Sequence, residues 1–242
     1  MNLFNSVIKI FQDRSIVEDQ HQEQCPYCHK TLKKLPGTKT KCQFCKKYMY
    51  VRTYNDKRQI VTLDEAFRID WLKTFDDDLR GKKKEQFELI KEDLKEKFNG
   101  VTPTNTDVLW GIYNQDLIQH ISNGDWGGYR CIKFDMAEML RKEERWKNSV
   151  QVFLEVCYLD LNGPTNGNNF KDPELLEKFP AWNPAVGGLY YTEIIKKVIA
   201  KSGLSKDSVK EMFMNDAEKL QKTLLLPISP DVAWFKIERE LF

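Results

Sequence analysis

Four cysteines near the N-terminus form two closely spaced pairs. Cys25 and Cys28 make one C-x-x-C pair, Cys42 and Cys45 make another, and thirteen residues separate the pairs. Each pair can hold two thiolates on one tight turn, and closing the intervening hairpin brings four sulfurs to the corners of a tetrahedron. Zn²⁺ accepts this ligand set and keeps no open coordination position, so the spacing predicts a structural zinc ion rather than a catalytic one.

Other uses of the four cysteines are free thiols, disulfides or a redox motif. A redox C-x-x-C normally occurs singly and near a βαβ pattern, which this sequence lacks. His29 is a competing ligand by position, but four cysteines already fill a zinc shell. The cysteine spacing therefore favours a metal site.

The cysteine pattern resembles that of a zinc ribbon over about residues 23–54. The sequence Cys-Pro-Tyr-Cys…Lys-Cys-Gln-Phe-Cys-Lys-Lys-Tyr is similar to that of zinc ribbons found at the N-termini of uncharacterised bacterial and prophage proteins. The resemblance implies a cytoplasmic phage or mobile-element accessory factor that binds a host or phage protein. In such ribbons, Gly usually follows the second Cys of each pair, where φ is positive. This sequence departs from that pattern. His29 and Lys46 occupy those positions.

Positive charge is concentrated in the same segment. Between Cys25 and Arg58 ten basic residues face one acidic residue, Asp56, so a chain of net charge +2 has a basic head and an acidic remainder. Basic residues interleaved with Tyr and Phe suit nucleic-acid binding, through phosphate neutralisation and base stacking. The candidate residues are Lys33, Lys34, Lys41, Lys46, Lys47, Arg52, Lys57 and Arg58. The alternative is that the lysines only offset a four-thiolate zinc centre of charge about −2.

The sequence as a whole predicts a mainly α fold with a small β zinc ribbon near the N-terminus. We expect an amphipathic helix and linker over 1–22, the ribbon over 23–58, and a multi-helix bundle or solenoid-like body over 59–242. Tyr48–Tyr54 alternates as the last strand of the ribbon, and Thr62 with Glu65 forms a capping box before the first body helix. We expect that helix to be interrupted at Gly81.

Residues 129–162 resemble one tetratricopeptide-type helix pair. Small residues at Ala137 and Ser149 let two antiparallel helices approach, and Leu140 and Phe153 fill the space beside them. No second copy follows at the expected period, and stable arrays usually need three or more. An αα-hairpin within a helical body is therefore favoured over a repeat array.

No catalytic constellation stands out. A Gly-rich phosphate loop and an H-E-x-x-H motif are absent, and Asp76, Asp77 and Asp78 are expected to form a solvated turn rather than a Mg²⁺ site. Cys131 and Cys157 are expected to be buried thiols. The chain has no apolar run of membrane-spanning length, which with reduced cysteines favours the cytoplasm.

Two main functional hypotheses follow. The first is a non-enzymatic interaction protein whose helical body binds a protein partner, with homo-oligomerisation left open. The second is a nucleic-acid-binding regulatory or accessory protein that acts through the basic ribbon. A metal-dependent nuclease built from scattered acidic residues is a third.

Overall fold

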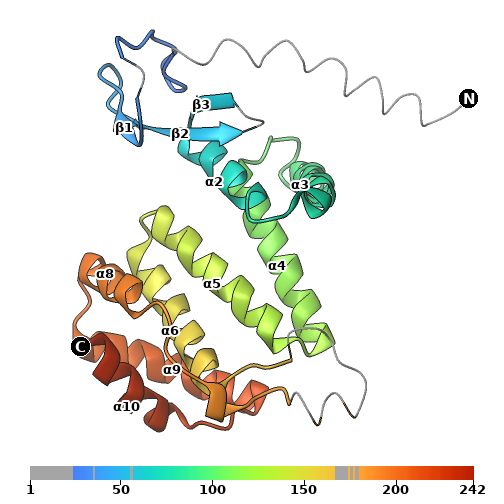
Figure 1. Cartoon of the computed structure of the whole chain (residues 1–242), viewed down its shortest axis with the longest axis vertical. Coiled ribbons are helices and arrows are strands. Elements are labelled where there is room, and N and C mark those ends of the chain that lie inside the picture. The colour runs from blue at the N-terminus through green and yellow to red at the C-terminus, as the bar shows by residue number, and fades with distance from the viewer. Residues whose placement is uncertain (1–23, 35, 55–56, 167–173, 175–176, 178–179) are drawn as a thin grey trace, which may run out of the picture. The chain divides into compact units, whose positions relative to one another are not determined.

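The computed structural model describes residues 24–34, 36–54, 57–166, 174, 177 and 180–242. The helix and linker expected over 1–22 lie outside these residues. The described part is mainly α-helical, with a small antiparallel sheet near its N-terminal end, as the sequence predicts (Figure 1). None of the described helices is both long enough and apolar enough to cross a lipid bilayer.

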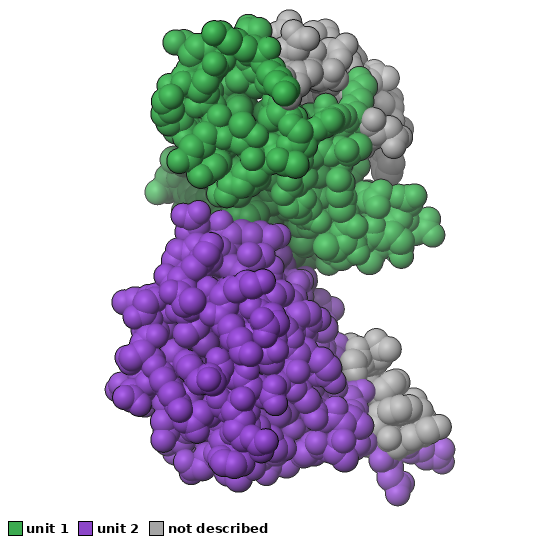
Figure 2. Space-filling model, turned by 60° about the vertical axis from the view of Figure 1, so that its left-hand side comes forward, with its two compact units in different colours: residues 1–112 green, residues 113–242 purple. Residues whose placement is uncertain are grey.

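The chain divides into two compact units, Met1–Ile112 and Tyr113–Phe242 (Figure 2). The first contains the sheet and the four cysteines, and the second contains a helical bundle. This division falls inside a helix, well after the ribbon boundary expected at 58/59, which stays a prediction.

The sheet has three strands in the order β1-β2-β3, namely Thr40–Lys41, Tyr48–Tyr54 and Lys57–Val61. Lys41 pairs with Tyr48, and Tyr50 pairs with Val61. The expected strand at Tyr48–Tyr54 is confirmed, but it is not the last, because β3 follows it. The β3 sequence begins with the exposed Lys57 and Arg58 and has apolar residues only at its end, so it lacks the alternation typical of a strand.

The strand β2 separates two small apolar clusters. Met49 packs with Ile60 and the cysteines on one face of the sheet. Tyr50 and Tyr54 lie on the other face, against a cluster that includes Ala66 of the first helix. Successive side chains of a strand point to opposite faces, so the alternation in β2 builds both clusters at once.

The helices of the first unit begin at side-chain caps. They are α2 (Leu63–Leu72), α3 (Asp77–Lys97) and α4 (Asn105–Asn123), the last of which runs on into the second unit. The predicted capping box is confirmed, because Thr62 Oγ1 accepts from the Glu65 amide at 3.1 Å and Glu65 Oε2 accepts from the Thr62 amide at 2.8 Å. Asp64 in turn accepts from the Thr106 amide at 2.8 Å, which joins the start of α4 to α2.

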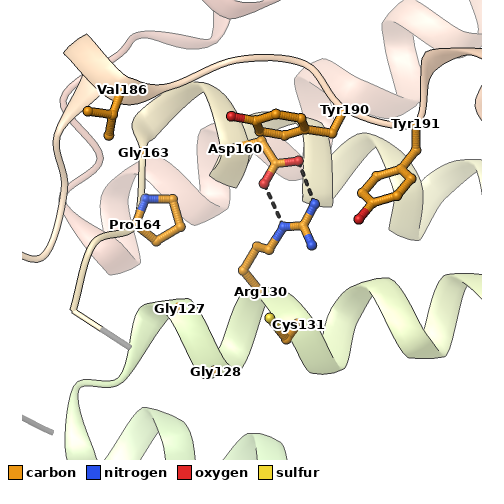
Figure 3. A pocket seen from close by; sticks show the side chains of 10 residues that line it. All are labelled: Gly127, Gly128, Arg130, Cys131, Asp160, Gly163, Pro164, Val186, Tyr190 and Tyr191. Carbon is orange, nitrogen blue, oxygen red and sulfur yellow. Dashed lines mark hydrogen bonds and ion pairs between the residues drawn. The ribbon is translucent and has the colours of Figure 1, made fainter. Parts of the chain in front are cut away.

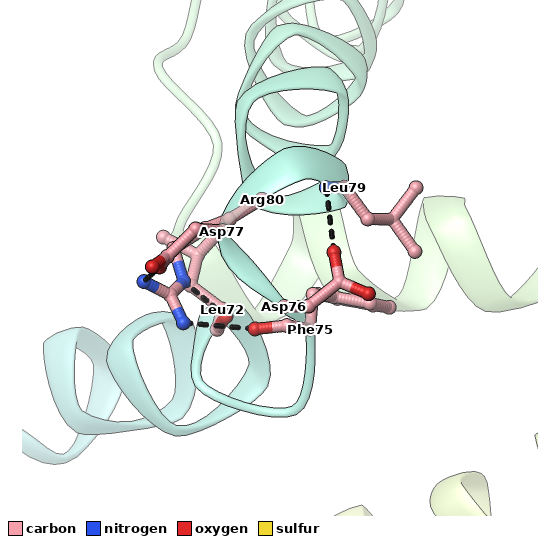
Figure 4. A network of polar contacts seen from close by, with 6 residues as sticks. All are labelled: Leu72, Phe75, Asp76, Asp77, Leu79 and Arg80. Atoms are coloured by element: carbon pink, nitrogen blue, oxygen red, sulfur yellow. Dashed lines mark hydrogen bonds and ion pairs between the residues drawn. The ribbon is translucent and has the colours of Figure 1, made fainter.

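The interruption expected at Gly81 is wrong, since Gly81 lies inside α3 and the break occurs earlier, before Asp76. Asp76 caps α3 by accepting from the Leu79 amide at 2.8 Å (Figure 4). Arg80 donates to the Leu72 and Phe75 carbonyls at 3.2 and 2.8 Å, which satisfies carbonyls at the end of α2 and in the turn (Figure 4). The Asp76 cap and the Arg80 hydrogen bonds therefore stabilise the turn between α2 and α3, and this turn does not need a glycine.

The second unit is built around one buried helix. Its elements are α5 (Trp126–Lys142), α6 (Trp146–Asn162), η1 (Pro184–Val186), α8 (Thr192–Ser202), α9 (Lys206–Leu224) and α10 (Pro230–Leu241). α6 contacts α5, α8, α9 and α10, an arrangement of a bundle rather than of a stacked repeat. The predicted close approach of α5 and α6 is confirmed, because Ser149 Oγ donates to the Ala137 carbonyl at 2.9 Å and both residues are buried.

Two glycines that end helices in this unit give a matched test of the packing. Gly163 and Gly203 cap α6 and α8 with φ of +62° and +68°. A Cβ at Gly163 would lie 2.0 Å from the Asn183 carbonyl oxygen, whereas a Cβ at Gly203 would meet open space. We expect Gly163→Ala to destabilise the unit by about 3 kcal/mol, and Gly203→Ala by about 1 kcal/mol from backbone strain alone. Urea unfolding followed by circular dichroism measures both, and equal losses would contradict the close approach of Asn183.

Candidate metal centre

Two turns with the same hydrogen-bond pattern hold the four cysteines. In the first, the Cys25 amide donates to the Lys30 carbonyl at 3.0 Å and the His29 amide donates to the Cys25 carbonyl at 2.9 Å. In the second, the Cys42 and Lys46 amides make the equivalent bonds at 2.8 and 3.1 Å, to the Lys47 and Cys42 carbonyls. Each turn thus returns the chain within six residues and places two thiols side by side.

The residue after each C-x-x-C pair lies in the left-handed region, with φ of +54° at His29 and +62° at Lys46. Zinc-ribbon turns usually have Gly here, and the present turns adopt the same conformation without it. A side chain in this region costs about 1 kcal/mol relative to glycine. The surrounding hydrogen bonds therefore hold both turns in a mildly strained form.

The four sulfurs converge on one point. All four Sγ atoms lie within 4.8 Å of one another. The Cys25–Cys45 and Cys28–Cys42 sulfur pairs are 3.7 and 3.8 Å apart, and none of the four is in a disulfide. A tetrahedral centre with metal–sulfur bonds near 2.3 Å requires sulfur–sulfur distances of about 3.8 Å. The cluster therefore fits a four-coordinate metal site, as the cysteine spacing predicts.

The turns also prepare a thiolate. Burial raises the pKa of the Cys25 thiol to about 12. Burial acts in the same direction on Cys42, but hydrogen bonds from the Cys45 and Phe44 amides outweigh it, and the pKa of Cys42 falls to about 6. The Phe44 amide lies 3.4 Å from the Cys42 sulfur. Amides that point at sulfur stabilise the charged ligand form, and a bound cation would ionise the remaining thiols.

The four cysteines are also part of a small apolar core beside the sheet. Cys25 and Cys42 are fully buried and pack with Met49 and Ile60. Tyr27, inside the first turn, accepts through its hydroxyl from the Leu63 amide at 3.1 Å, which joins this turn to the start of α2. So few apolar side chains make a very small core, and a metal would supply much of its stability.

The structure places most of the predicted basic residues at the surface. Exposed residues of this set are Lys33, Lys34, Lys41, Lys46, Lys47, Lys57 and Arg58. Arg52 differs, because it is half-buried and its guanidinium donates to both Asp70 carboxylate oxygens at 2.6 and 2.8 Å. This pairing raises the pKa of Arg52 and joins β2 to α2. The Arg52 guanidinium is thus already committed to a carboxylate inside the first unit.

Two further lysines belong to the same surface and were not among the predicted set. Lys39 Nζ lies 4.4 Å from the Tyr48 ring centre, and Lys30 Nζ lies 5.0 Å from the Phe44 ring centre. Lys41 Nζ also lies 4.9 Å from the Tyr48 ring centre. Lys41 pairs with Tyr48 in the sheet, and Lys39 directly precedes β1, so the proximity of Lys39 to Tyr48 depends on the strand register.

The acidic run at the start of α3 serves that helix. Asp76 is its N-cap and Asp77 pairs with Arg80 (Figure 4). Carboxylates in a first helical turn stabilise the helix dipole. These contacts within the helix account for both carboxylates.

A cavity of about 640 Å³ lies in the second unit, beside the start of α5. Its floor carries Arg130, which donates to both Asp160 oxygens at 2.5 and 2.7 Å, and Tyr190 and Tyr191 lie at its side (Figure 3). The pair joins α5 to α6 and satisfies both charges mutually. Cys131 on the same wall is exposed, contrary to its expected burial, whereas Cys157 is buried as expected.

Comparison with protein-family models, with curated proteins and with solved structures finds no match for this chain.

The strain after the second cysteine pair gives a test of the metal site. We expect Lys46→Gly to raise metal affinity about fivefold, since metal binding is coupled to folding of the turn and glycine removes the backbone penalty. Lys46→Ala is the matched control, because it removes the same side chain but keeps the penalty. Competition with a chromophoric chelator measures both, and equal affinities for the two variants would contradict the strained turn.

Proposed function

We propose that this protein is a non-enzymatic nucleic-acid-binding accessory protein, and that a zinc-stabilised ribbon is its binding module. Zinc is the metal proposed, because four thiolates in a tetrahedron suit Zn²⁺ and leave no coordination position for a substrate. Such a centre shapes a surface rather than performing a reaction. The function then depends on what this surface presents.

The observation that carries the proposal is a set of exposed lysines without carboxylate partners. Within the described residues, none of these seven ammonium groups forms an ion pair: Lys30, Lys33, Lys34, Lys39, Lys41, Lys46 and Lys47. Lysines elsewhere in the chain are often paired, for example Lys133 with Glu155 at 2.9 Å. Unpaired charges of one sign repel each other, and a polyanion relieves that repulsion.

The excess is larger than the metal centre requires. Between Cys25 and Arg58 the excess of nine positive charges exceeds the charge of about −2 of a Zn²⁺ bound by four thiolates. Phosphates with condensed counterions would bind such a surface mainly through counterion release, with strong dependence on salt. The acidic remainder of the chain limits the contact to the ribbon.

Charge reversal of the ribbon lysines tests this function. We expect Lys33→Glu with Lys34→Glu, and separately Lys46→Glu with Lys47→Glu, to weaken oligonucleotide binding at least tenfold near 100 mM salt. Each pair should also reduce the slope of log K against log salt by about 1.5 to 2, because two phosphate contacts are lost. Fluorescence anisotropy with labelled single-stranded and duplex oligonucleotides measures both quantities.

The control is Lys210→Glu with Lys222→Glu, which makes the same change in net charge on exposed residues of the second unit. It should leave affinity within about twofold, since long-range charge effects are screened over about 10 Å. If the control weakens binding as much as the ribbon variants do, only net charge matters and the proposed module is wrong.

A second candidate function is binding of a protein partner by the helical body. Its supporting observation is on α10, whose inner face is buried through Ala233, Trp234 and Ile237. The outer face carries Val232 and Phe235, which are 52% and 61% exposed. An amphipathic helix normally carries polar residues there, and exposed apolar side chains are typical of a contact surface. The partner would present an apolar surface of its own, on another protein or on a second copy of this chain.

Replacement of the outer-face residues tests this candidate. We expect Val232→Ser with Phe235→Ser to abolish a stable association, either self-association seen by light scattering or retention of a partner in affinity purification. Truncating buried apolar anchors commonly costs 2 kcal/mol or more, which is about thirtyfold in affinity. Val186→Ser, at a residue 57% exposed elsewhere in the same unit, is the control. Identical behaviour of wild type and the double variant would exclude α10 as a contact surface.

A further inference from the structure

We infer that the ribbon selects single-stranded nucleic acid, because the rings of Phe44 and Tyr48 form stacking platforms for unpaired bases. This inference rests on the proposed function and specifies its ligand. Lysine charge alone would bind any polyanion, whereas exposed rings placed among those lysines add a contact that only accessible bases can make.

Phe44 and Tyr48 are the exposed rings of the ribbon, at 42% and 43% exposure. The other ring side chains of the described ribbon have structural roles. Tyr27 accepts from the Leu63 amide, and Tyr50 and Tyr54 pack on the cluster under α2. Phe44 lies inside the second cysteine turn and Tyr48 begins β2, so the hydrogen bonds of the turn and the strand hold both backbones in place.

Tyr48 lies on the same face of β2 as Tyr50, which follows from the two-residue period of a strand. Tyr50 packs against the Val61, Ala66 and Ile69 cluster, whereas Tyr48 is not among the residues that contact this cluster in the described structure. The strand therefore carries one aromatic face that is covered at one end and open at the other. The open end is where Lys39 and Lys41 lie.

An ammonium group lies over each exposed ring. Lys30 is 5.0 Å from the centre of Phe44, and Lys39 and Lys41 are 4.4 and 4.9 Å from the centre of Tyr48. An exposed contact of this kind changes an equilibrium only about two- to fivefold. Stacking of one base on an aromatic ring is worth about five- to 150-fold. The flexible lysines can exchange a ring for a phosphate, so stacking and charge neutralisation proceed together.

The preference for a single strand follows from access to the faces of the bases. In a duplex the bases are stacked on each other and paired, and only their edges reach the grooves, so a ring on a small rigid turn has no base face to contact. In a single strand each base has an accessible face, and stacking tolerates any sequence. A single strand is therefore the ligand that uses both the lysines and the rings.

The experiment measures affinities of the full-length, metal-loaded protein for a labelled 15-nucleotide mixed-sequence strand and for the corresponding duplex. Anisotropy is recorded at several salt concentrations for wild type, Phe44→Leu, Tyr48→Leu and Tyr48→Phe. We expect the strand to bind at least tenfold more tightly than the duplex. Each leucine variant should lose about five- to twentyfold in strand affinity, with duplex affinity within twofold and an unchanged salt slope. Tyr48→Phe keeps the ring face and should retain strand affinity.

Tyr190→Leu is the control for loss of an exposed ring, since Tyr190 is 54% exposed in the second unit. Metal content of every variant is measured first. If Phe44→Leu loses metal, the Tyr48→Leu and Tyr48→Phe pair decides the outcome.

The outcomes distinguish the proposed nucleic-acid binding from the inferred preference for a single strand. Salt-sensitive binding that is equal for strand and duplex, or leucine variants that bind the strand like wild type, would overturn the stacking platforms and leave the lysine surface intact. Absence of binding to either form at low salt would overturn the proposed function together with this inference. Strand preference lost in the leucine variants and kept in Tyr48→Phe supports both.

Discussion

The main constraint on the first unit is the repulsion between four adjacent cysteine sulfurs when they are ionised. Four sulfurs within 4.8 Å of one another, two of them fully buried, cannot all carry charge unless a cation lies between them. The two cysteine turns contribute amide hydrogen bonds that favour the thiolate, but burial outweighs them at Cys25, whose pKa is raised, whereas they outweigh burial at Cys42, whose pKa is lowered. A bound divalent metal would resolve this imbalance, and it would replace the large apolar core that so short a segment cannot build.

The rest of the first unit depends on this centre through the sheet. On one face of β2, Met49 packs with the cysteines. On the opposite face, Tyr50 and Tyr54 pack against residues of α2. The bond from the Leu63 amide to Tyr27 and the Arg52–Asp70 pair connect the same elements at their surface. Lys46 and Lys47 sit directly after the last cysteine, so the turn that holds the sulfurs also sets the position of the basic surface.

Local patterns were predictable from sequence, and features that depend on distant partners were not. The cysteine spacing, the Thr62–Glu65 capping box and the small residues of the α5–α6 pair each act within a few residues or follow a fixed helical period. The strand β3 is not predictable from its own pattern, because its pairing with β2 stabilises it. The end of α2 is not visible in the local sequence, because Arg80 in the next helix donates to the Leu72 carbonyl at that end and to the Phe75 carbonyl in the turn.

The same distinction applies to the site. The four candidate metal ligands are a sequence motif, and the structure brings their sulfur atoms together as expected. The sequence shows the positive charge of Arg52 but not its pairing, because its partner Asp70 lies eighteen residues away in the chain. The proximity of Lys30 to Phe44 and of Lys39 to Tyr48 is not visible in the sequence, because it follows from turn geometry and strand register.

The most direct measurement of the central claim is X-ray absorption at the zinc edge on the protein purified without added metal. The account predicts about one zinc per chain, surrounded by four sulfur atoms at about 2.3 Å. A protein without zinc, or zinc bound by oxygen and nitrogen atoms, would contradict a four-cysteine centre as the core of the ribbon.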